Sequence, residues 1–321
     1  MKSKVFKAGL AAFLFLTAGH SAAADVVDGP VRLVVPFAAG GSVDAMARIV
    51  ASGLEVSLGQ PVVVENRNGA EGSIAAQAVI RSNPDGKTLL VGTTTQLLWV
   101  PLTRKEVPYD PLVALKPVGM LGEAAFFLYV NSSVPASTVN ELISYAKDNP
   151  EKLHFAYGNS TGNIAAAQFT QKTGIKFNGV PYNGEAQAIA DLLGDHVQMM
   201  FATTVSLLEQ VKQGKVKVLA VVGSARSPLA PDVPTFNELG IDAVDLSPWS
   251  GVFAPGGTPA DLTTKLSDAV DKALSNPSVR ERLEGTGLTI RQMSSKEMTP
   301  FISAELEKWE GIISSAGVVK K

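Results

Sequence analysis

Three loops rich in glycine and hydroxyl side chains carry the residue types that could bind an anion. They are residues 36–44, with Gly40 and Gly41, residues 93–96, and residues 157–163. Each follows a run of strand-forming residues, and the first and third lead into runs with helical spacing. A helix N-terminus offers unpaired N–H groups and a partial positive charge, which bind anions without a cationic side chain. The loops together predict an anion site where several strands end.

The paired glycines of the first loop leave two interpretations open. Gly40 and Gly41 could let the backbone approach a ligand closely or adopt positive φ. The loop could also be an ordinary turn into a helix, capped by Ser42 or Asp44.

The third loop also fits a nucleophile pattern. Residues 158–162 read G-x-S-x-G around Ser160, in a strand–turn–helix setting that suits a hydrolase. A triad would need an acid and then a histidine after the serine, but His154 precedes it and His196 lies at a turn before a strand. A serine hydrolase therefore stays the lesser alternative. The same sparse histidines, with no calcium-loop or phosphate-loop motif, predict neither a metal nor a cofactor.

Composition sets the class of protein. The chain has 321 residues, 45% of them hydrophobic and 18% charged, with no cysteine and a net charge of −2. This apolar content supports real cores and excludes a disordered chain. A near-neutral charge argues against nucleic acid as a partner. The missing cysteine excludes disulfides, thiolate nucleophiles and cysteine-based metal centres.

The N-terminus has the three parts of an export signal. Lys2, Lys4 and Lys7 precede an apolar run at residues 10–18, and Ala22 and Ala24 form an A-x-A cleavage pattern. A buried N-terminal helix is the alternative. We predict cleavage after Ala24 and a periplasmic location. No later apolar run is long enough to span a membrane.

Strand and helix patterns alternate along the rest of the chain and predict an α/β protein with parallel sheets. Strands are expected at residues 31–35, 62–65, 88–92, 126–130, 153–156, 176–180, 197–201 and 216–222. Helices are expected between them and at 260–275, 277–285 and 295–316. The length suggests two lobes, one of residues 25–122 plus 227–321 and one of 123–225. The proline-rich stretch 227–234 is either the crossover between them or a surface loop.

A series of motifs in order carries a family resemblance. The residues are 34–48 (VVPFAAGGSVDAMAR), 63–72 (VVENRNGAEG), 84–86, 108–111, 180–184 (VPYNG), 219–221, 231–240 (PDVPTFNELG), 249–251 and 254–259. The chain resembles the periplasmic solute-binding proteins of tripartite tricarboxylate transporters, the Bug-type family, over nearly all of the mature sequence.

The resemblance implies a two-lobed periplasmic-binding-protein fold, type II-like, in which each lobe is a mostly parallel sheet with flanking helices and the ligand lies between the lobes. It implies a carboxylate held by backbone N–H groups of residues 37–41 and 160–162, with Asp44 closing the first loop and Tyr182, Asn183 and Thr203 near the cleft. Trp249, in a loop with polar neighbours, could wall the pocket or cover a lobe edge. The predicted ligand contacts are Phe37, Ala38, Ala39, Gly40, Gly41, Asp44, Thr94, Thr95, Ser160, Thr161, Gly162, Tyr182, Asn183, Thr203 and Trp249.

The sequence also departs from the family pattern. Ala38 stands where many members have a second proline. Residues 202–204 lack an aspartate found in that stretch of many members, which puts a contact to a ligand amine in doubt. Residues 93–99 are bulkier and more apolar than usual. We therefore hypothesise room for an apolar or aromatic carboxylate, with Trp99 contributing to it.

The predicted function is capture of a small organic carboxylate, a di- or tricarboxylate or an aromatic acid, for a tripartite tricarboxylate-type transporter. The expected partners are the ligand and the membrane permease subunits, and the expected state is a monomer. The alternative from another class is a ligand sensor that docks on a membrane kinase. The hydrolase using Ser160 is the third.

Overall fold

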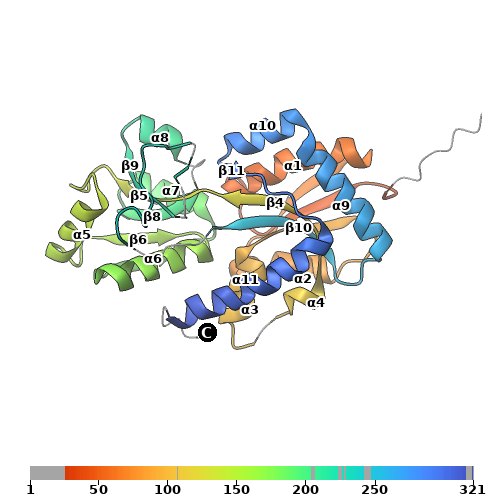
Figure 1. Cartoon of the computed structure of the whole chain (residues 1–321), viewed down its shortest axis with the longest axis horizontal. Helices are drawn as coiled ribbons and strands as arrows, with labels where there is room; N and C mark the ends of the chain where they lie inside the picture. The colour runs from red at the N-terminus through yellow and green to blue at the C-terminus, as the bar shows by residue number, and fades with distance from the viewer. Residues whose placement is uncertain are drawn as a thin grey trace, which may run out of the picture.

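The computed structural model describes residues 26–106, 108–203, 207–222, 226–227, 229–241, 247–315 and 320. These residues form two lobes, each built around one β-sheet with helices on its faces (Figure 1). The predicted export signal lies outside the described residues. None of the described helices is long and apolar enough to cross a membrane.

Lobe 1 holds the first and last parts of the chain. Its sheet has the order β11 (Leu288–Thr289), β4 (Leu115–Ala124), β10 (Trp249–Pro255), β3 (Thr88–Thr93), β1 (Val31–Val35) and β2 (Val62–Asn66). On one face, Leu33 and Val35 of β1 are buried with residues of α1 (Ser42–Leu58), α9 (Ala260–Ser275) and α10 (Pro277–Gly285). On the other face, Val34 is buried with residues of α2 (Ser73–Ile80) and α11 (Ser295–Ser315). Burial on both faces explains why β1 and β3 are mostly apolar and do not alternate between apolar and polar residues.

Lobe 2 holds the middle of the chain. Its sheet has the order β7 (Asn178–Pro181), β6 (His154–Tyr157), β8 (Met199–Thr203), β5 (Phe126–Asn131) and β9 (Val216–Val222). Phe127 and Tyr129 of β5 are buried with residues of α7 (Glu185–Leu193). Phe126 and Leu128, on the opposite face, are buried with residues of α5 (Val139–Asp148) and α6 (Ser160–Thr173). The short α8 (Leu208–Lys212) precedes β9.

Both sheets are mixed. The expected parallel pairing is present in β2–β1–β3 and in β7–β6–β8. Antiparallel strands then extend each sheet: β10 pairs with β3 and β4, and β5 pairs with β8 and β9. The long strands β4 and β10 run side by side toward lobe 2, and β4 continues into β5 (Figure 1). The sequence pattern missed β4 and β10 because both contain glycine and proline, which usually mark turns.

The proline-rich stretch belongs to lobe 2 as far as it is described. Val221 of β9 pairs with Thr235, and the Val221 N–H donates to the Pro234 carbonyl. Phe236 packs edge-on against Phe169 of α6, with 5.5 Å between ring centroids. The chain is back in lobe 1 at β10. The return to lobe 1 therefore comes later than the predicted boundary at residue 227.

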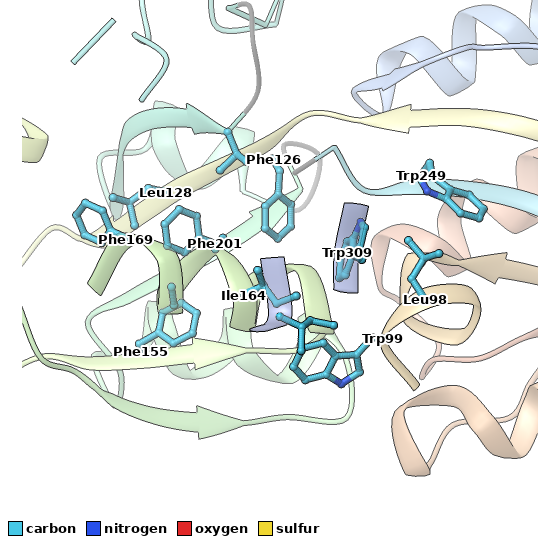
Figure 2. Packing of buried hydrophobic residues seen from close by; sticks show 14 of the residues in the cluster. Leu98, Trp99, Phe126, Leu128, Phe155, Ile164, Phe169, Phe201, Trp249 and Trp309 are labelled. Carbon is cyan, nitrogen blue, oxygen red and sulfur yellow. The ribbon is translucent and has the colours of Figure 1, made fainter. Parts of the chain in front are cut away.

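A single group of buried apolar side chains continues from one lobe into the other. Figure 2 shows Phe126 and Ile164 of lobe 2, Leu98 and Trp99 of lobe 1, and Trp309 of α11, which in this view lies between Phe126 and Leu98. Residues 95–99, expected to be a loop, form the π-helix η2 (Thr95–Trp99), followed by α3 (Val100–Thr103). We call this shared apolar region the interlobe core.

Candidate functional site

Three helices begin at the cleft between the lobes. Helix α1 starts at Ser42 after β1, α6 starts at Ser160 after β6, and α7 starts at Glu185 after β7. A cavity between the lobes is lined from all three starts, by Phe37, Ala38, Gly41, Ser42, Val43, Gly158, Asn159, Asn183, Gly184, Glu185, Ala186 and Gln187. We call this point the helix junction. It combines the N–H donors and positive ends of three helices.

The start of α6 presents donors that the protein itself leaves unused. Asn159 caps the helix by accepting the Gly162 N–H at 2.8 Å. Within the described part of the chain, the N–H groups of Ser160 and Thr161 have no hydrogen-bond partner. Both residues are buried, at 4% and 1% exposure. Buried N–H groups without partners carry a desolvation cost, which a bound anion would relieve.

Asp44 orders the start of α1. Its carboxylate accepts hydrogen bonds from the Gly40 N–H, from Asn66 Nδ2 and from Arg48, each near 3 Å. Gly40 takes a φ of +86°, which is one of the two roles expected for the glycines of this loop. Burial alone would raise the pKa of Asp44, but the bonds from Arg48, Gly40 and Asn66 outweigh it and hold that pKa below its ordinary value. The carboxylate is thus committed to the loop, and the helix cap at Gly41 has no side-chain hydrogen bond.

Gly158 is required by the packing of two loops. A Cβ on Gly158 would lie 2.3 Å from the Gly184 carbonyl carbon and 2.6 Å from the Glu185 N. Real Cβ atoms never approach backbone so closely, so only glycine allows the start of α7 to lie against the end of β6. This contact fixes where Glu185 enters the cleft.

Glu185 is a buried carboxylate held without a cation. Its Oε1 accepts Asn159 Nδ2 at 3.0 Å and the Thr203 N–H at 3.3 Å. Its Oε2 accepts Thr203 Oγ1 at 2.8 Å and Ser42 Oγ, from the opposite lobe, at 2.9 Å. No lysine, arginine or histidine of the described chain pairs with it. Burial raises the pKa of Glu185, and the hydrogen bonds from Thr203, Ser42 and Asn159 do not cancel that effect.

Two further hydrogen bonds join the lobes beside the helix junction. The Thr94 and Thr161 hydroxyls lie 3.1 Å apart, and those of Thr95 and Ser160 lie 2.8 Å apart. All four residues are buried. Residues 93–96 and 160–162, selected from sequence as separate loops, therefore meet across the cleft.

These contacts lie between two larger cavities. The inner one has mostly apolar walls and is lined by Phe37, Ser42, Val43, Met46, Thr93, Thr94, Thr95, Ala124, Phe126, Asn159, Thr161, Glu185, Thr203, Pro248, Trp249, Ser250, Thr286 and Leu288. We call it the inner chamber. Trp249 is 1% exposed, and its Nε1–H has no hydrogen-bond partner among the described residues. The chamber thus offers apolar contact, with Glu185 as its charged group.

The second cavity, of about 390 Å³, opens on the other side of Phe37 and Asn159. We call it the outer cavity. Its walls are residues of lobe 1 around Gly69–Gly72 and residues of lobe 2 that include Ser160, Tyr182 and Asn183. The Tyr182 hydroxyl donates to Asp191 at 2.6 Å, and burial together with that bond raises the pKa of Tyr182 to about 12. Tyr182 is therefore a fixed wall of the cavity that stays protonated.

A family model described as the tripartite tricarboxylate transporter family receptor, TctC, matches residues 46–318. The chain belongs to this TctC family. It is also similar to three solved structures. The periplasmic binding protein BugD is 31% identical with a TM-score of 0.87, covering 92% of this chain and 99% of that one. R. palustris Rpa4515 with adipate is 32% identical with a TM-score of 0.87, covering 91% and 98%. MatC from Rhodopseudomonas palustris with bound malate is 31% identical with a TM-score of 0.84, covering 89% and 99%.

These similarities confirm the predicted family and the two-lobed α/β binding-protein fold. The TctC description also ties the family to a transporter. BugD is a periplasmic binding protein, and two further similar structures are a periplasmic transporter and a TctC solute binding protein from Polaromonas.

The structure of this TctC member gathers most of the predicted contacts at the cleft. Phe37, Ala38, Gly41, Thr94, Thr95, Ser160, Thr161, Tyr182, Asn183, Thr203 and Trp249 line one or more of the three cavities. Ala39 and Gly40 are exposed on the loop, and Asp44 lies behind it. Gly162 lies behind the α6 start, with its N–H bonded to Asn159. These four residues line none of the three cavities.

The two tryptophans differ from expectation. Trp249 lies on strand β10 and walls the inner chamber. Trp99 is in the helical segment, 5% exposed, and its Nε1–H donates to Glu71 at 3.0 Å. Trp99 lines none of the three cavities, so it does not shape room for an aromatic ligand as hypothesised. The apolar walls come from Phe37, Phe126 and Leu288 instead.

No described contact supports the hydrolase alternative. The Ser160 hydroxyl is paired with the Thr95 hydroxyl, and neither His154 nor His196 lines a cleft cavity. The described residues contain no cluster of acidic and histidine side chains that could hold a metal ion.

Sequence reasoning missed several cleft residues, and Glu185 is the most important of them. Its position in the first turn of a helix reads as ordinary helix-end electrostatics, since acidic residues are common there. Ser42 was considered only as a helix cap, and Asn159 only as part of a loop. Glu185 accepts hydrogen bonds from Ser42 and Asn159 because three helices begin at the same point of the cleft. The spacing of these residues in the sequence does not predict that arrangement.

Proposed function

We propose that this protein is the exported, periplasmic receptor of a tripartite tricarboxylate-type transporter and captures a small organic carboxylate between its lobes. The observation that carries the proposal is the convergence of three helix starts on the cleft, with the buried N–H groups of Ser160 and Thr161 left unpaired. Rpa4515 and MatC, with closely similar folds, hold adipate and malate. Membership of the TctC family, described as tripartite tricarboxylate transporter receptors, supports the role in a transporter.

The mechanism follows from the donors. A carboxylate entering through the outer cavity exchanges water for the N–H groups of α6 and the partial positive charge of the helix ends. Because these donors are fixed by the backbone, no buried arginine is needed to balance the charge. The hydroxyl contacts between Thr94, Thr95, Thr161 and Ser160 then hold the lobes in the form presented to the permease subunits. The protein acts as a monomer and catalyses no reaction.

A thermal-shift screen of residues 25–321 tests this proposal. The panel holds mono-, di-, tri- and aromatic carboxylates, their amides, neutral sugars and amino acids. A ligand at 100 times its Kd adds about 2.7 kcal/mol of stability, a shift of a few degrees for a protein of this size. We expect carboxylate hits that disappear with the amides. Hits confined to neutral solutes would contradict the proposal.

The export step has its own test. N-terminal sequencing of the protein from a periplasmic extract should begin at Asp25. A sensor role would use the same cleft, and two gene deletions distinguish it from a receptor role. If the protein is a transport receptor, deleting the permease genes abolishes uptake of the ligand. If it is a sensor, deleting the gene of its kinase abolishes the transcriptional response to the ligand.

A further inference from the structure

We propose that Glu185 occupies one of the carboxylate positions of the cleft, so that this protein takes monocarboxylates with an apolar body and rejects dicarboxylates. This inference rests on the proposed function and narrows its substrate class. It begins from the hydrogen bonds of the helix junction.

The Glu185 carboxylate sits where a ligand anion would sit. It is bonded by Ser42 at the start of α1, by Asn159 at the cap of α6, and by Thr203 at the end of β8, while Glu185 itself is the first residue of α7. A carboxylate has about four acceptor sites, and these four bonds fill them. The protein has thus filled the junction of three helix starts with its own anion.

The described residues still offer free donors for a ligand carboxylate. They include the N–H groups of the buried residues Ser160 and Thr161 and, in the inner chamber, the Trp249 Nε1–H. Thr161 and Glu185 line the same inner chamber, so a second ligand carboxylate there would meet a buried acid whose hydrogen-bond donors are already taken. Like charges in a partly desolvated site repel, and the one Trp249 N–H fills only one of the four acceptor sites of a second carboxylate.

The walls of the inner chamber favour an apolar group instead. Phe37, Val43, Met46, Phe126, Trp249 and Leu288 contribute apolar surface to it. A ligand that binds its carboxylate at the α6 start can therefore place a hydrocarbon chain or ring in the chamber. The neighbours with adipate and malate hold ligands with two carboxylates. The Glu185 arrangement predicts a different ligand class within the same fold.

Two substitutions separate the charge of Glu185 from its shape. In Glu185→Gln the amide oxygen can accept from Asn159 and the Thr203 N–H, and the amide N–H group can donate to the Ser42 and Thr203 hydroxyls, because both Oε2 partners are hydroxyls. The variant keeps the contacts and loses the charge. Glu185→Ala removes both the charge and the hydrogen bonds, and leaves Ser42, Asn159 and Thr203 free to donate to a ligand. Glu284→Gln, on the exposed face of α10, is the control for net charge.

Isothermal titration with matched acids is the test. The pairs are hexanoate with adipate and benzoate with terephthalate, measured on residues 25–321. For the natural protein we expect the monocarboxylate of at least one pair to bind about tenfold or more tightly than its partner, the scale of one close charge contact. Glu185→Gln should reduce that preference, and Glu185→Ala should abolish or reverse it, while Glu284→Gln leaves it unchanged.

Three outcomes would overturn the inference. Equal or tighter binding of both dicarboxylates by the natural protein is the first. A preference for monocarboxylates that neither Glu185 variant changes is the second. The third is binding of neutral solutes alone, which refutes the proposed function itself. Thermal unfolding of each variant comes first, and Glu185→Gln alone decides if Glu185→Ala does not fold.

Discussion

The two lobes meet through two regions of opposite character, and the contrast explains how one protein can be both rigid and receptive. The interlobe core is apolar, with Leu98, Phe126, Ile164 and Trp309 almost fully buried (Figure 2). The helix junction is polar, and it is held by hydroxyl contacts and by Glu185. Apolar burial supplies stability that does not depend on direction, whereas polar groups in a cleft supply selectivity. Substitutions in the two regions should therefore have separable effects.

The largest expected effect is on the interlobe core. Trp309→Ala removes a large side chain that is 1% exposed, and loss of a buried aromatic destabilises by about 3–5 kcal/mol. Urea unfolding followed by fluorescence and circular dichroism measures it. If the loss is below about 1 kcal/mol, less than any typical core truncation, the apolar region does not support the fold as described.

Gly158→Ala tests the contact that positions Glu185. The added Cβ overlaps the Gly184 carbonyl, so the start of α7 has to move, with a loss of about 1–3 kcal/mol typical of overpacking. Carboxylate affinity should fall as well, because the helix junction is displaced. Gly285→Ala is a useful control, since Gly285 likewise has no positive φ but has open space where the Cβ would lie. If Gly158→Ala binds carboxylates with unchanged affinity, the helix junction does not contribute to binding.

Asp44→Asn tests the ordering of the first loop through pH. The pKa of Asp44 is lowered in the folded protein, so its stabilising effect is present above the ordinary value of 3.8 and is lost as pH falls through the folded value. The variant should lose about 1–3 kcal/mol at pH 7, as expected for bonds to a charged group. Its unfolding free energy should then change less than that of the natural protein on acidification below pH 4. Parallel curves would contradict this role.

Glu185→Gln should change the pH dependence in the opposite sense. Because the folded pKa of Glu185 is raised, the native state holds a proton more tightly than the unfolded state above the ordinary value of 4.5. Stability therefore falls as pH rises from 4.5 through the folded value, and the amide removes that fall. Thermal unfolding from pH 4 to pH 8 detects the difference. An identical slope in both proteins would show that Glu185 is not desolvated.

The smallest effect is expected for the hydroxyl bridge between the lobes. A double-mutant cycle of Thr95→Val and Ser160→Ala should give a coupling energy of about 0.5–1.5 kcal/mol, the usual range for one hydrogen bond. The coupling should grow in the presence of ligand if the bridge belongs to the binding form. Zero coupling energy with and without ligand would show that the Thr95–Ser160 hydrogen bond does not stabilise the contact between the lobes.

Much of the fold was accessible from sequence because its signals are local. The apolar run of β1, the glycines of residues 36–44 and the spacing of α1 all report on short-range structure, and the structure matches them. The strands β4 and β10 were missed because glycine and proline inside them read as turns. Their pairing is decided by partners more than 100 residues away in sequence, as Val252 with Gly119 shows.

The site was predictable only in part for the same reason. Loops at strand ends could be chosen from residue type, and the structure brings residues 93–96 and 160–162 together. The role of Glu185 depends on Ser42, 143 positions away, and on Asn159, 26 positions away. Trp99 is a residue type that often lines ligand pockets, but here its Nε1–H donates a hydrogen bond to Glu71. Only the assembled structure shows that Glu185 lines the cleft and that Trp99 does not.

The central claim is that the start of α6 holds the ligand carboxylate through the N–H groups of Ser160 and Thr161. Nitrogen-15 amide spectra of residues 25–321, titrated with a carboxylate that binds, test it most directly. We predict that the Ser160 and Thr161 amide protons shift downfield and are more protected from exchange when the acid is bound. A carboxylate that binds while both amide signals stay unchanged would contradict the account.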